Sequence, residues 1–473
     1  MGPRSSTLRW QLTLSFCSAL AGAACSGGVA RGQGGTTASN EISGTAPREP
    51  LVVEARPLTE NGMVVEPPPA PPEPKPRPPV GTGPAVTDGT LGGAIPIEDP
   101  SGRALAAFHA ALGRAERREG RARIAFYGAS HVASDLFTGR IRQRLQARFG
   151  DAGPGFVLPA KPWRWYRHHG VKIEKSRGFD DLRVRARAPK DDIYGLAGVA
   201  LQTDDKYGRG ILRTRKNGGL EGMASRFELY YLKQPNGGTM SVFIDGERTR
   251  NLGARAKGTE TAYAAFEVEP GHHTLEVRTH GNGPVRLFGV SVERDAPGVI
   301  LDTLGIPGAR ARYHLHWDEG VYREHLLRRN PDLIVLAYGT NEAGDDDVPI
   351  ERYEGRLRQV MKRLREILPA ASCLLVGPSD RPIKDDDGSY STRPRTAQLV
   401  ESQRRVSAEM GCGFFDLVAF MGGDMSMVRW VATEPPMGAK DHVHFTKHGY
   451  VRLGDVLHDA LLEGYTATAP AAP

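Results

Sequence analysis

Two stretches far apart in the chain carry the side chains that a serine-based acyl transfer needs. Ser130 lies in Gly-Ala-Ser-His (128–131), and Asp441 stands three residues before His444. A serine hydroxyl is a weak nucleophile unless a base within hydrogen-bond reach takes its proton. An aspartate can hold an imidazole through Nδ1 and leave Nε2 to receive that proton. We therefore predict that Ser130 is the nucleophile, His444 the general base and Asp441 the residue that orients it.

Acyl transfer also requires hydrogen-bond donors directed at the oxygen on which negative charge develops. Three groups of the chain could form this oxyanion hole. They are the backbone N–H of Gly308, the side-chain amide of Asn341 and the backbone N–H of Ser130 itself.

Other roles for these residues are open. Ser130 could cap a helix, because serine is a preferred N-cap residue. His442 could replace His444 as the base, although the Asp-x-x-His spacing favours His444. His442, His444 and His448 could bind a metal together with Asp441, since His-x-His spacing occurs in metal sites. The sequence offers no second cluster of ligands, so we predict neither a metal nor another cofactor.

The candidate residues follow apolar segments that have the length of strands. Residues 124–127 precede the serine motif, 298–304 precede Gly308, and 333–338 precede Asn341. Further strands are predicted at 373–376 and 413–417, and helices at 103–118, from Val132 onward, at 350–368 and at 397–410. Alternating strands and helices indicate an α/β fold with a doubly wound, five-stranded, mostly parallel sheet, which binds ligands at the carboxyl ends of its strands.

Residues 170–296 have a different pattern, in which alternating β-branched and aromatic segments are separated by turn sequences such as Pro-Asn-Gly-Gly at 235–238. We predict a β-sandwich inserted between the first two strands of the α/β domain. The catalytic domain would then consist of residues 96–169 and 297–465. The insertion could bind carbohydrate or only shape the cleft.

The first 25 residues are typical of an export signal, because arginines at 4 and 9 precede an apolar segment too short to span a bilayer. Gly-Ala-Ala-Cys, ending at Cys25, resembles the bacterial lipoprotein processing site, in which the cysteine is lipidated. Ordinary cleavage without a lipid is the alternative. Residues 26–95, rich in Gly and Pro, are predicted to be a disordered linker, and 466–473 a disordered tail.

Cysteines and charge bear on compartment and partners. In an exported protein Cys373 and Cys412 could form a disulfide if their strands are neighbours, or could remain buried thiols. The formal net charge of +7 is compatible with acidic glycans or membrane headgroups. Basic residues are spread along the chain, so a nucleic-acid partner is not expected.

Four motifs in order, Gly-Ala-Ser-His (128–131), Gly308 in Ile-Pro-Gly-Ala, Gly-Thr-Asn-Glu (339–342) and Asp-x-x-His (441–444), resemble the four blocks of the SGNH hydrolases, also called the GDSL family. The segment 149–157, Gly-Pro-Ser-Asp (377–380) and the insertion are most similar to the branch that contains bacterial peptidoglycan O-acetylesterases. The resemblance implies the flavodoxin-like SGNH hydrolase fold and the residue roles given above. Ala129 stands where the family usually has aspartate, which bears on loop rigidity and rate.

Together with the export signal, the resemblance leads us to expect a monomeric serine esterase of the periplasm or cell envelope, held at the membrane if Cys25 is lipidated. Its expected partner is an O-acetylated polysaccharide, with peptidoglycan favoured. Two other functions remain open. One is a polysaccharide O-acetyltransferase with the same triad, and the other is a non-catalytic glycan-binding envelope protein.

Overall fold

The structure is a computed structural model that describes residues 91–174, 177–184, 191–216 and 222–466. The predicted export signal with Cys25, the linker up to residue 90 and the tail from residue 467 lie outside the described residues. No helix in the described part of the chain is long and apolar enough to cross a membrane.

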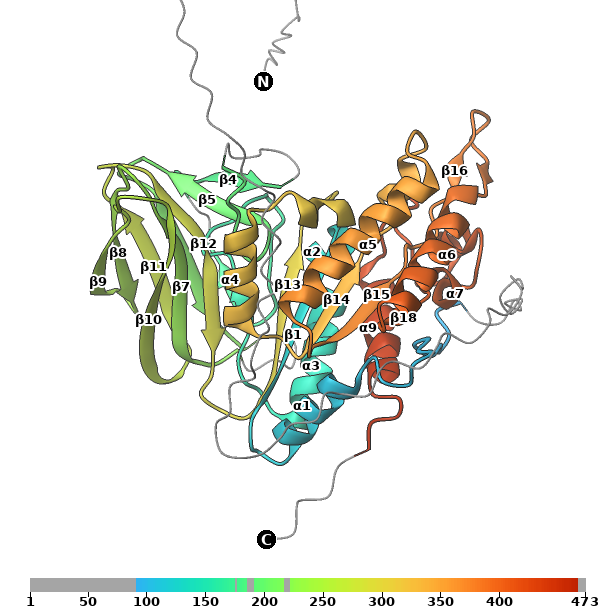
Figure 1. Cartoon of the computed structure of the whole chain (residues 1–473), viewed down its shortest axis with the longest axis horizontal. Coiled ribbons are helices and arrows are strands. Elements are labelled where there is room, and N and C mark those ends of the chain that lie inside the picture. The colour runs from blue at the N-terminus through green and yellow to red at the C-terminus, as the bar shows by residue number, and fades with distance from the viewer. Residues whose placement is uncertain (1–90, 175–176, 185–190, 217–221, 467–473) are drawn as a thin grey trace, which may run out of the picture. The chain divides into compact units, whose positions relative to one another are not determined.

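A five-stranded parallel sheet forms the centre of the α/β domain (Figure 1). Its strands lie in the order β13-β1-β14-β15-β18, so the second strand of the domain is at one edge and the first is beside it. This is the flavodoxin-like order. The predicted fold class is therefore confirmed. The strands are β1 (Arg121–Gly128), β13 (Gly298–Gly305), β14 (Leu333–Ala337), β15 (Ser372–Val376) and β18 (Gly413–Phe415).

Helices cover both faces of this sheet, which explains why its strands are apolar almost throughout. Ile124 and Phe126 of β1 pack on one face, and Ala125 and Tyr127 pack on the other. The first face is covered by α1 (Ala106–Glu116), α3 (Phe137–Phe149), α7 (Leu417–Met421), α8 (Ser426–Ala432) and α9 (Lys447–Leu461). The second is covered by α4 (Glu319–Arg329), α5 (Ile350–Ile367) and α6 (Pro394–Glu409).

Two antiparallel sheets lie between β1 and β13 in the sequence, as expected for an inserted β domain. One has the order β10-β7-β12-β5-β4 and the other β3-β6-β11-β8-β9. The short β2 (Gly155–Val157) also pairs with β12. The strands are β3 (Val171–Ile173), β4 (Asp180–Arg183), β5 (Val199–Thr203), β6 (Arg209–Thr214), β7 (Ala224–Lys233), β8 (Thr239–Ile244), β9 (Glu247–Gly253), β10 (Glu260–Gly271), β11 (Thr274–Thr279) and β12 (Val285–Glu293).

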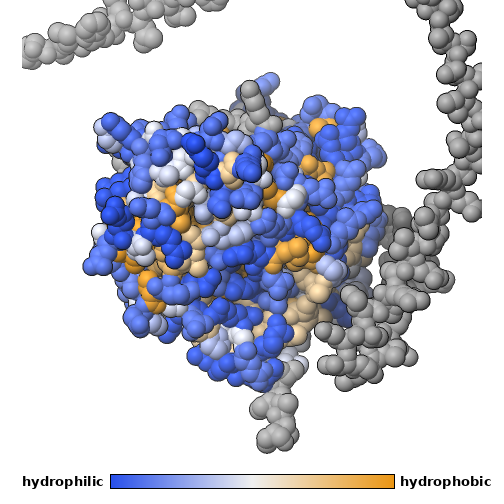
Figure 2. Space-filling view, turned by 60° about the vertical axis from the view of Figure 1, so that its left-hand side comes forward, coloured by the Kyte–Doolittle hydropathy of each residue, from blue (hydrophilic) through white to orange (hydrophobic). Residues whose placement is uncertain are grey.

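The inner faces of the two antiparallel sheets share one core, to which Leu229 and Val290 contribute from one sheet and Val242 and Leu275 from the other. The molecular face seen when these sheets are turned forward is mostly hydrophilic, with small separate apolar patches (Figure 2). The alternating pattern of the sequence predicts strands at 199–202, 227–232, 240–244, 264–268, 274–278 and 285–292, but it does not predict β2, β3, β4, β6 or β9. β9 lacks an apolar alternation because all but one of its side chains are partly or fully exposed at the sheet edge.

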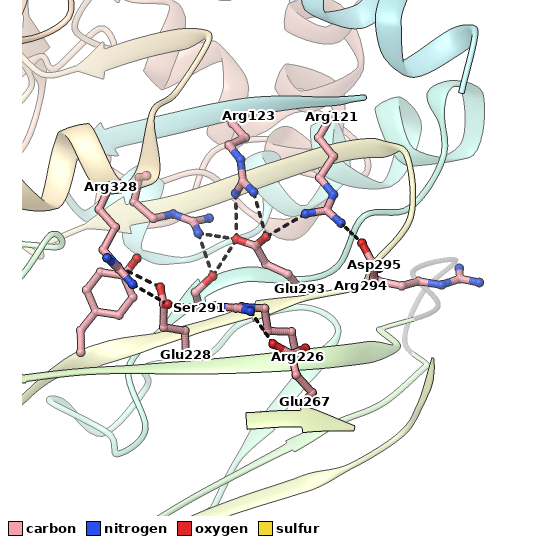
Figure 3. A pocket seen from close by; sticks show the side chains of 12 residues that line it. Arg121, Arg123, Arg226, Glu228, Glu267, Ser291, Glu293, Arg294, Asp295 and Arg328 are labelled. Carbon is pink, nitrogen blue, oxygen red and sulfur yellow. Dashed lines mark hydrogen bonds and ion pairs between the residues drawn. The ribbon is translucent and has the colours of Figure 1, made fainter. Parts of the chain in front are cut away.

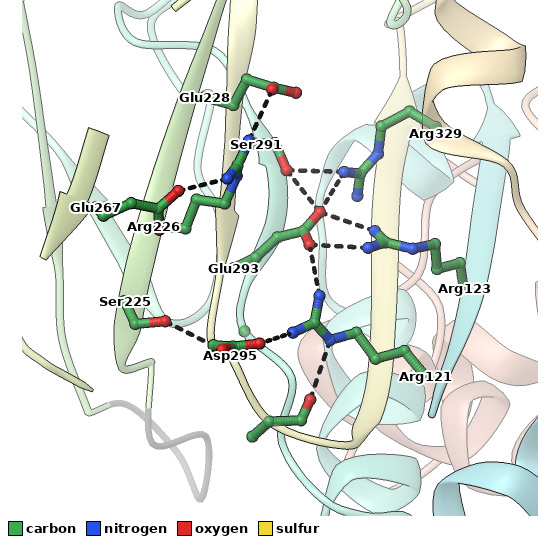
Figure 4. Close-up of polar contacts among 12 residues, drawn as sticks. Arg121, Arg123, Ser225, Arg226, Glu228, Glu267, Ser291, Glu293, Asp295 and Arg329 are labelled. Atoms are coloured by element: carbon green, nitrogen blue, oxygen red, sulfur yellow. Dashed lines mark hydrogen bonds and ion pairs between the residues drawn. The ribbon is translucent and has the colours of Figure 1, made fainter. Parts of the chain in front are cut away.

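An ion-pair network joins the β domain to the α/β domain. Glu293 at the end of β12 accepts two hydrogen bonds from Arg123 of β1, at 2.7 and 2.8 Å (Figure 4). Arg329 at the end of α4 contacts Glu293 as well and makes a two-bond pair with Asp302. Arg328 pairs in the same way with Glu228 of β7 (Figure 3). All of these side chains except Asp302 line a cavity of about 680 Å³, so the junction is polar.

Cys373 of β15 and Cys412, which precedes β18, form a disulfide with their Cα atoms 4.8 Å apart. The two strands are parallel neighbours in the sheet, and Leu374 lies beside Gly413. Of the two alternatives for these cysteines, the structure contains the disulfide.

Candidate active site

Ser130, His444 and Asp441 lie in one hydrogen-bonded line. His444 Nε2 is 2.8 Å from Ser130 Oγ, and His444 Nδ1 is 2.7 Å from Asp441 Oδ2. Because a carboxylate only accepts, the hydrogen of the neutral ring belongs on Nδ1, which leaves Nε2 to accept from the serine hydroxyl. The three residues predicted to act together are therefore in contact, and His444 rather than His442 contacts the serine.

Ser130 begins a single helical turn directly after β1. Gly128 makes this turn possible, because a Cβ there would lie 2.3 Å from Val132 Cγ2 and 2.8 Å from Ala337 O. The turn, α2 (Ser130–Ala133), ends before Asp135, whose φ is +48°. The continuous helix predicted from Val132 is therefore wrong, since α3 begins only at Phe137.

The break in the helix has a clear cause in the buried carboxylate of Asp135. This group pairs with Arg142 at 3.0 Å and accepts hydrogen bonds from the hydroxyls of Thr138 and Thr303. Burial raises the pKa of Asp135, but the charge of Arg142, together with the contributions of His168 and His169, outweighs burial and holds the pKa well below its usual range. The chain leaves the helical path here because the side chain must reach these partners.

Asp441 shapes the loop of the base as well as orienting the ring. Its Oδ1 accepts from the backbone N–H of Val443 at 3.0 Å and of His444 at 2.9 Å. Burial raises the pKa of Asp441, but the hydrogen bonds from His444 and Val443 outweigh it and lower the pKa to about 2. Asp441 is therefore ionised at neutral pH. The loop then enters α9, whose N-cap Thr446 accepts from Gly449 N–H.

The oxyanion-hole candidates come from the two strands that flank β1. Gly128 is aligned with Gly305 of β13 and with Ala337 of β14, so the loops after these strands lie on either side of the serine turn. Gly308 has a φ of +70°, which favours glycine. The Asn341 amide donates to Ala309 O at 2.9 Å, which joins the two loops. One hydrogen of that amide remains for another acceptor.

Glu342 also organises the site. It is the last residue of the motif Gly-Thr-Asn-Glu (339–342), and no role was predicted for it. Its carboxylate accepts from the N–H of Ala311 at 2.8 Å and of Gly339 at 3.0 Å. The side chain is buried, and burial raises its pKa. Glu342 thus holds the loop of Asn341 against the loop of Gly308. It begins the short 3-10 helix η2 (Glu342–Gly344), and Ala311 begins η1 (Ala311–Leu315).

His131 lies in a second polar chain beside the serine. Its Nδ1 is 2.9 Å from the Tyr450 hydroxyl, and its Nε2 is 3.3 Å from Ser379 Oγ, which is 3.1 Å from Thr340 Oγ1. Burial, together with the charge of nearby His444, lowers the pKa of His131 to about 3. The neutral ring therefore links the loops after β1, β14 and β15 to α9. No local sequence pattern indicates the contacts of His131 with Tyr450 and Ser379.

Ala129 is buried and contributes only a methyl group before the serine. The aromatic residues that follow β2 pack mainly on one another and on the core. Trp163 and Tyr166 make an edge-to-face contact at 5.3 Å, and the Tyr166 hydroxyl accepts from Leu158 N–H. Trp165 is 46% exposed.

Comparison with known proteins gives the following relations. Residues 271–452 match the model of the GDSL-like lipase/acylhydrolase family. A solved structure described as "Peptidoglycan O-acetylesterase in action, 5 min" is 25% identical to this chain, with a TM-score of 0.65. The match covers 78% of this chain and 99% of the chain in that structure. An acetyl xylan esterase, AlAXEase, is 18% identical over 34% of this chain and 80% of its own, with a TM-score of 0.26. A family two carbohydrate esterase from Clostridium thermocellum is 12% identical, and the match covers 58% of this chain and 99% of the esterase chain, with a TM-score of 0.26. No curated protein matches the chain in sequence.

Proposed function

We propose that this chain, an esterase of the SGNH/GDSL type, removes O-acetyl groups from envelope polysaccharide, with peptidoglycan as the favoured substrate. The observation that carries the proposal is the 2.8 Å contact between Ser130 Oγ and His444 Nε2, on a ring held by Asp441. This contact activates a hydroxyl that would otherwise be unreactive.

In the proposed first step, Ser130 Oγ attacks the acetyl carbonyl carbon while His444 Nε2 takes the hydroxyl proton. The carbonyl oxygen becomes an oxyanion, which the N–H groups of Ser130 and Gly308 and the second amide hydrogen of Asn341 stabilise. Asp441, ionised at neutral pH, stabilises the imidazolium and keeps its orientation. When the intermediate collapses, the C–O bond to the sugar breaks and His444 returns the proton to the sugar oxygen. The acetyl group stays on Ser130.

The second step uses water in place of the serine. His444 Nε2 takes a proton from a water molecule, whose oxygen attacks the acetyl carbonyl. Collapse of the second oxyanion breaks the bond to Ser130, which recovers its proton from His444. Acetate leaves, and the enzyme returns to its starting state.

Several observations support an acetylated envelope polymer as the substrate. The solved structure that covers 78% of this chain is described as a peptidoglycan O-acetylesterase. The Cys373–Cys412 disulfide suits an oxidising compartment outside the cytoplasm. We propose export to the envelope, with Cys25 as the lipid-bearing residue if the chain is processed as a lipoprotein. The segment 26–95 would then separate the catalytic domain from the membrane.

Mass spectrometry of O-acetylated peptidoglycan fragments treated with the purified protein tests the substrate. We expect products lighter by one acetyl group, together with free acetate. The Ser130→Ala variant is the control, and we expect it to keep its fold and to lose hydrolysis of both the fragments and an aryl acetate ester. Turnover by Ser130→Ala would exclude Ser130 as the nucleophile. Aryl acetate turnover by the wild type without release from any fragment would exclude peptidoglycan.

A further inference from the structure

Two aromatic rings stack beside the proposed triad. The rings of Tyr390 and His442 have centroids 4.1 Å apart and an interplanar angle of 26°. The Tyr390 hydroxyl is 3.0 Å from His442 Nδ1. Both side chains are half-buried, so part of each ring remains in contact with solvent. The mechanism proposed above uses neither residue.

His442 is held within the loop that carries the base. The Asp441 carboxylate binds the N–H groups of Val443 and His444, and the His442 N–H donates to Ala439 O at 3.0 Å. The backbone of His442 has a φ of +53°, an uncommon conformation for a residue other than glycine. The ring is therefore fixed within two residues of His444.

Tyr390 comes from a different loop that is also held firmly. It lies in the hairpin of β16 (Ile383–Lys384) and β17 (Tyr390–Ser391), which projects beyond α6 (Figure 1). Asp385 accepts from Ser391 Oγ at 3.0 Å within this hairpin. At its base, Arg381 donates to Thr340 O at 2.9 Å, next to Asn341. The stacked pair thus joins the loop of the base to a hairpin anchored on the oxyanion loop.

The hydrogen bonds fix which ring nitrogen of His442 carries its hydrogen. Nδ1 is 3.1 Å from Lys440 O, and because a carbonyl oxygen only accepts, Nδ1 is the donor. In the neutral ring Nε2 is then an acceptor, and it has no hydrogen-bond partner among the described residues. The Tyr390 hydroxyl can accept from Nδ1 and donate its own hydrogen elsewhere.

We infer that Tyr390 and His442 form a saccharide subsite that holds a pyranose ring of the substrate while its acetyl ester lies at Ser130. The inference rests on the proposed function. The C–H face of a pyranose is apolar, and its weakly positive hydrogens suit the negative face of an aromatic ring. The sugar hydroxyls lie at the ring edge, where His442 Nε2 can accept and the Tyr390 hydroxyl can donate. Such a subsite supplies binding energy away from the reacting carbonyl.

Kinetics on a large and a small ester test the subsite. We expect Tyr390→Ala to raise KM for an O-acetylated chitooligosaccharide about tenfold, and to lower the preference for that substrate over an aryl acetate by a similar factor. Tyr390→Phe keeps the ring face and should retain most of this preference. Tyr207→Ala is a matched control, because Tyr207 is 53% exposed and lies between β5 and β6, and we expect wild-type kinetics.

A binding measurement separates the subsite from the proposed reaction. Calorimetric titration with unacetylated chitooligosaccharide should show that the Ser130→Ala variant binds this ligand. Adding Tyr390→Ala to that variant should lower the affinity about tenfold. A wild-type KM in Tyr390→Ala would overturn the subsite, and so would equal affinity of the Ser130→Ala variant with and without Tyr390→Ala. An equal loss of kcat/KM on the chitooligosaccharide and on the aryl acetate would overturn the subsite too, because Tyr390 and His442 would then only position Asp441 and His444. Failure of the wild type to deacetylate any glycan would refute the proposed function instead, and the titration would still decide the subsite.

Discussion

The side-chain amide of Asn341 donates a hydrogen bond to Ala309 O at 2.9 Å, so the loops after β13 and β14 are joined at the residue that follows Gly308. This bond fixes the amide and aims its second hydrogen. We expect Asn341→Ala to lower kcat roughly 10²- to 10³-fold, because one oxyanion donor is lost, with little change in KM. Steady-state kinetics on an aryl acetate measure both constants. A rise in KM at unchanged kcat would show that Asn341 binds substrate rather than the oxyanion.

Glu342 should affect rate without touching the substrate. In Glu342→Gln one carboxylate oxygen is replaced by an NH₂ group, which cannot accept from Ala311 N–H or Gly339 N–H. An unpaired buried donor costs about 1–3 kcal/mol, so the two loops should separate. We expect a lower kcat at temperatures where circular dichroism shows the variant folded.

Two controls make the Glu342 prediction specific. Combining Glu342→Gln with Asn341→Ala should cost less than the sum of the two effects, because both act on one donor. Glu409→Gln, which removes an exposed pair with Arg358, should leave kcat unchanged. Additive losses in the double variant would mean that Glu342 acts elsewhere.

Much of the proposed catalytic arrangement could be predicted because its signals are local in the sequence. Each parallel strand is an apolar segment followed by glycine or polar residues, since helices bury both of its faces and its carboxyl end carries a loop. Asp441 and His444 are close enough in sequence for one loop to hold both. Once the sheet order is known, Ser130 and Asn341 must follow neighbouring strands.

The remaining features depend on contacts between distant residues. The helix break at Asp135 requires Thr303, which comes from another strand. The position of Tyr390 depends on a ring more than fifty residues later in the chain, at His442. The edge strand β9 has mostly exposed side chains, so its amphipathic signal is missing. Local patterns carry no information about such partners.

The junction between the domains should respond to pH through Glu293. Burial raises the pKa of Glu293, but the charges of Arg329 and Arg123 outweigh it and hold the pKa well below its usual range. A carboxyl whose pKa is lower in the folded state stabilises the fold above its unfolded pKa, which is about 4.3 for glutamate. This contribution is lost as the pH falls below that value.

We therefore expect Glu293→Gln to lower the free energy of unfolding by about 3–5 kcal/mol at pH 7, because Arg123 and Arg329 lose a buried partner. The difference from the wild type should shrink as the pH is lowered below about 4. Denaturant unfolding at several pH values measures it. Glu267→Gln, at an exposed position paired with Arg226, should change little. A pH-independent loss would show that packing, not charge, is responsible.

The Cys373–Cys412 bond closes a loop with a sequence separation of 39 across two neighbouring strands. Because a cross-link reduces the entropy of the unfolded chain, a loop of this length gives about 4 kcal/mol in the chain-entropy model. Replacing both cysteines with serine should lower the free energy of unfolding by roughly that amount. Parallel pairing with β14 holds β15 in the sheet without the cross-link, so kcat of the folded variant should stay near the wild-type value. Reductant should lower the stability of the wild type and leave that of the double variant unchanged. If reductant affected both proteins equally, the disulfide would not form in solution.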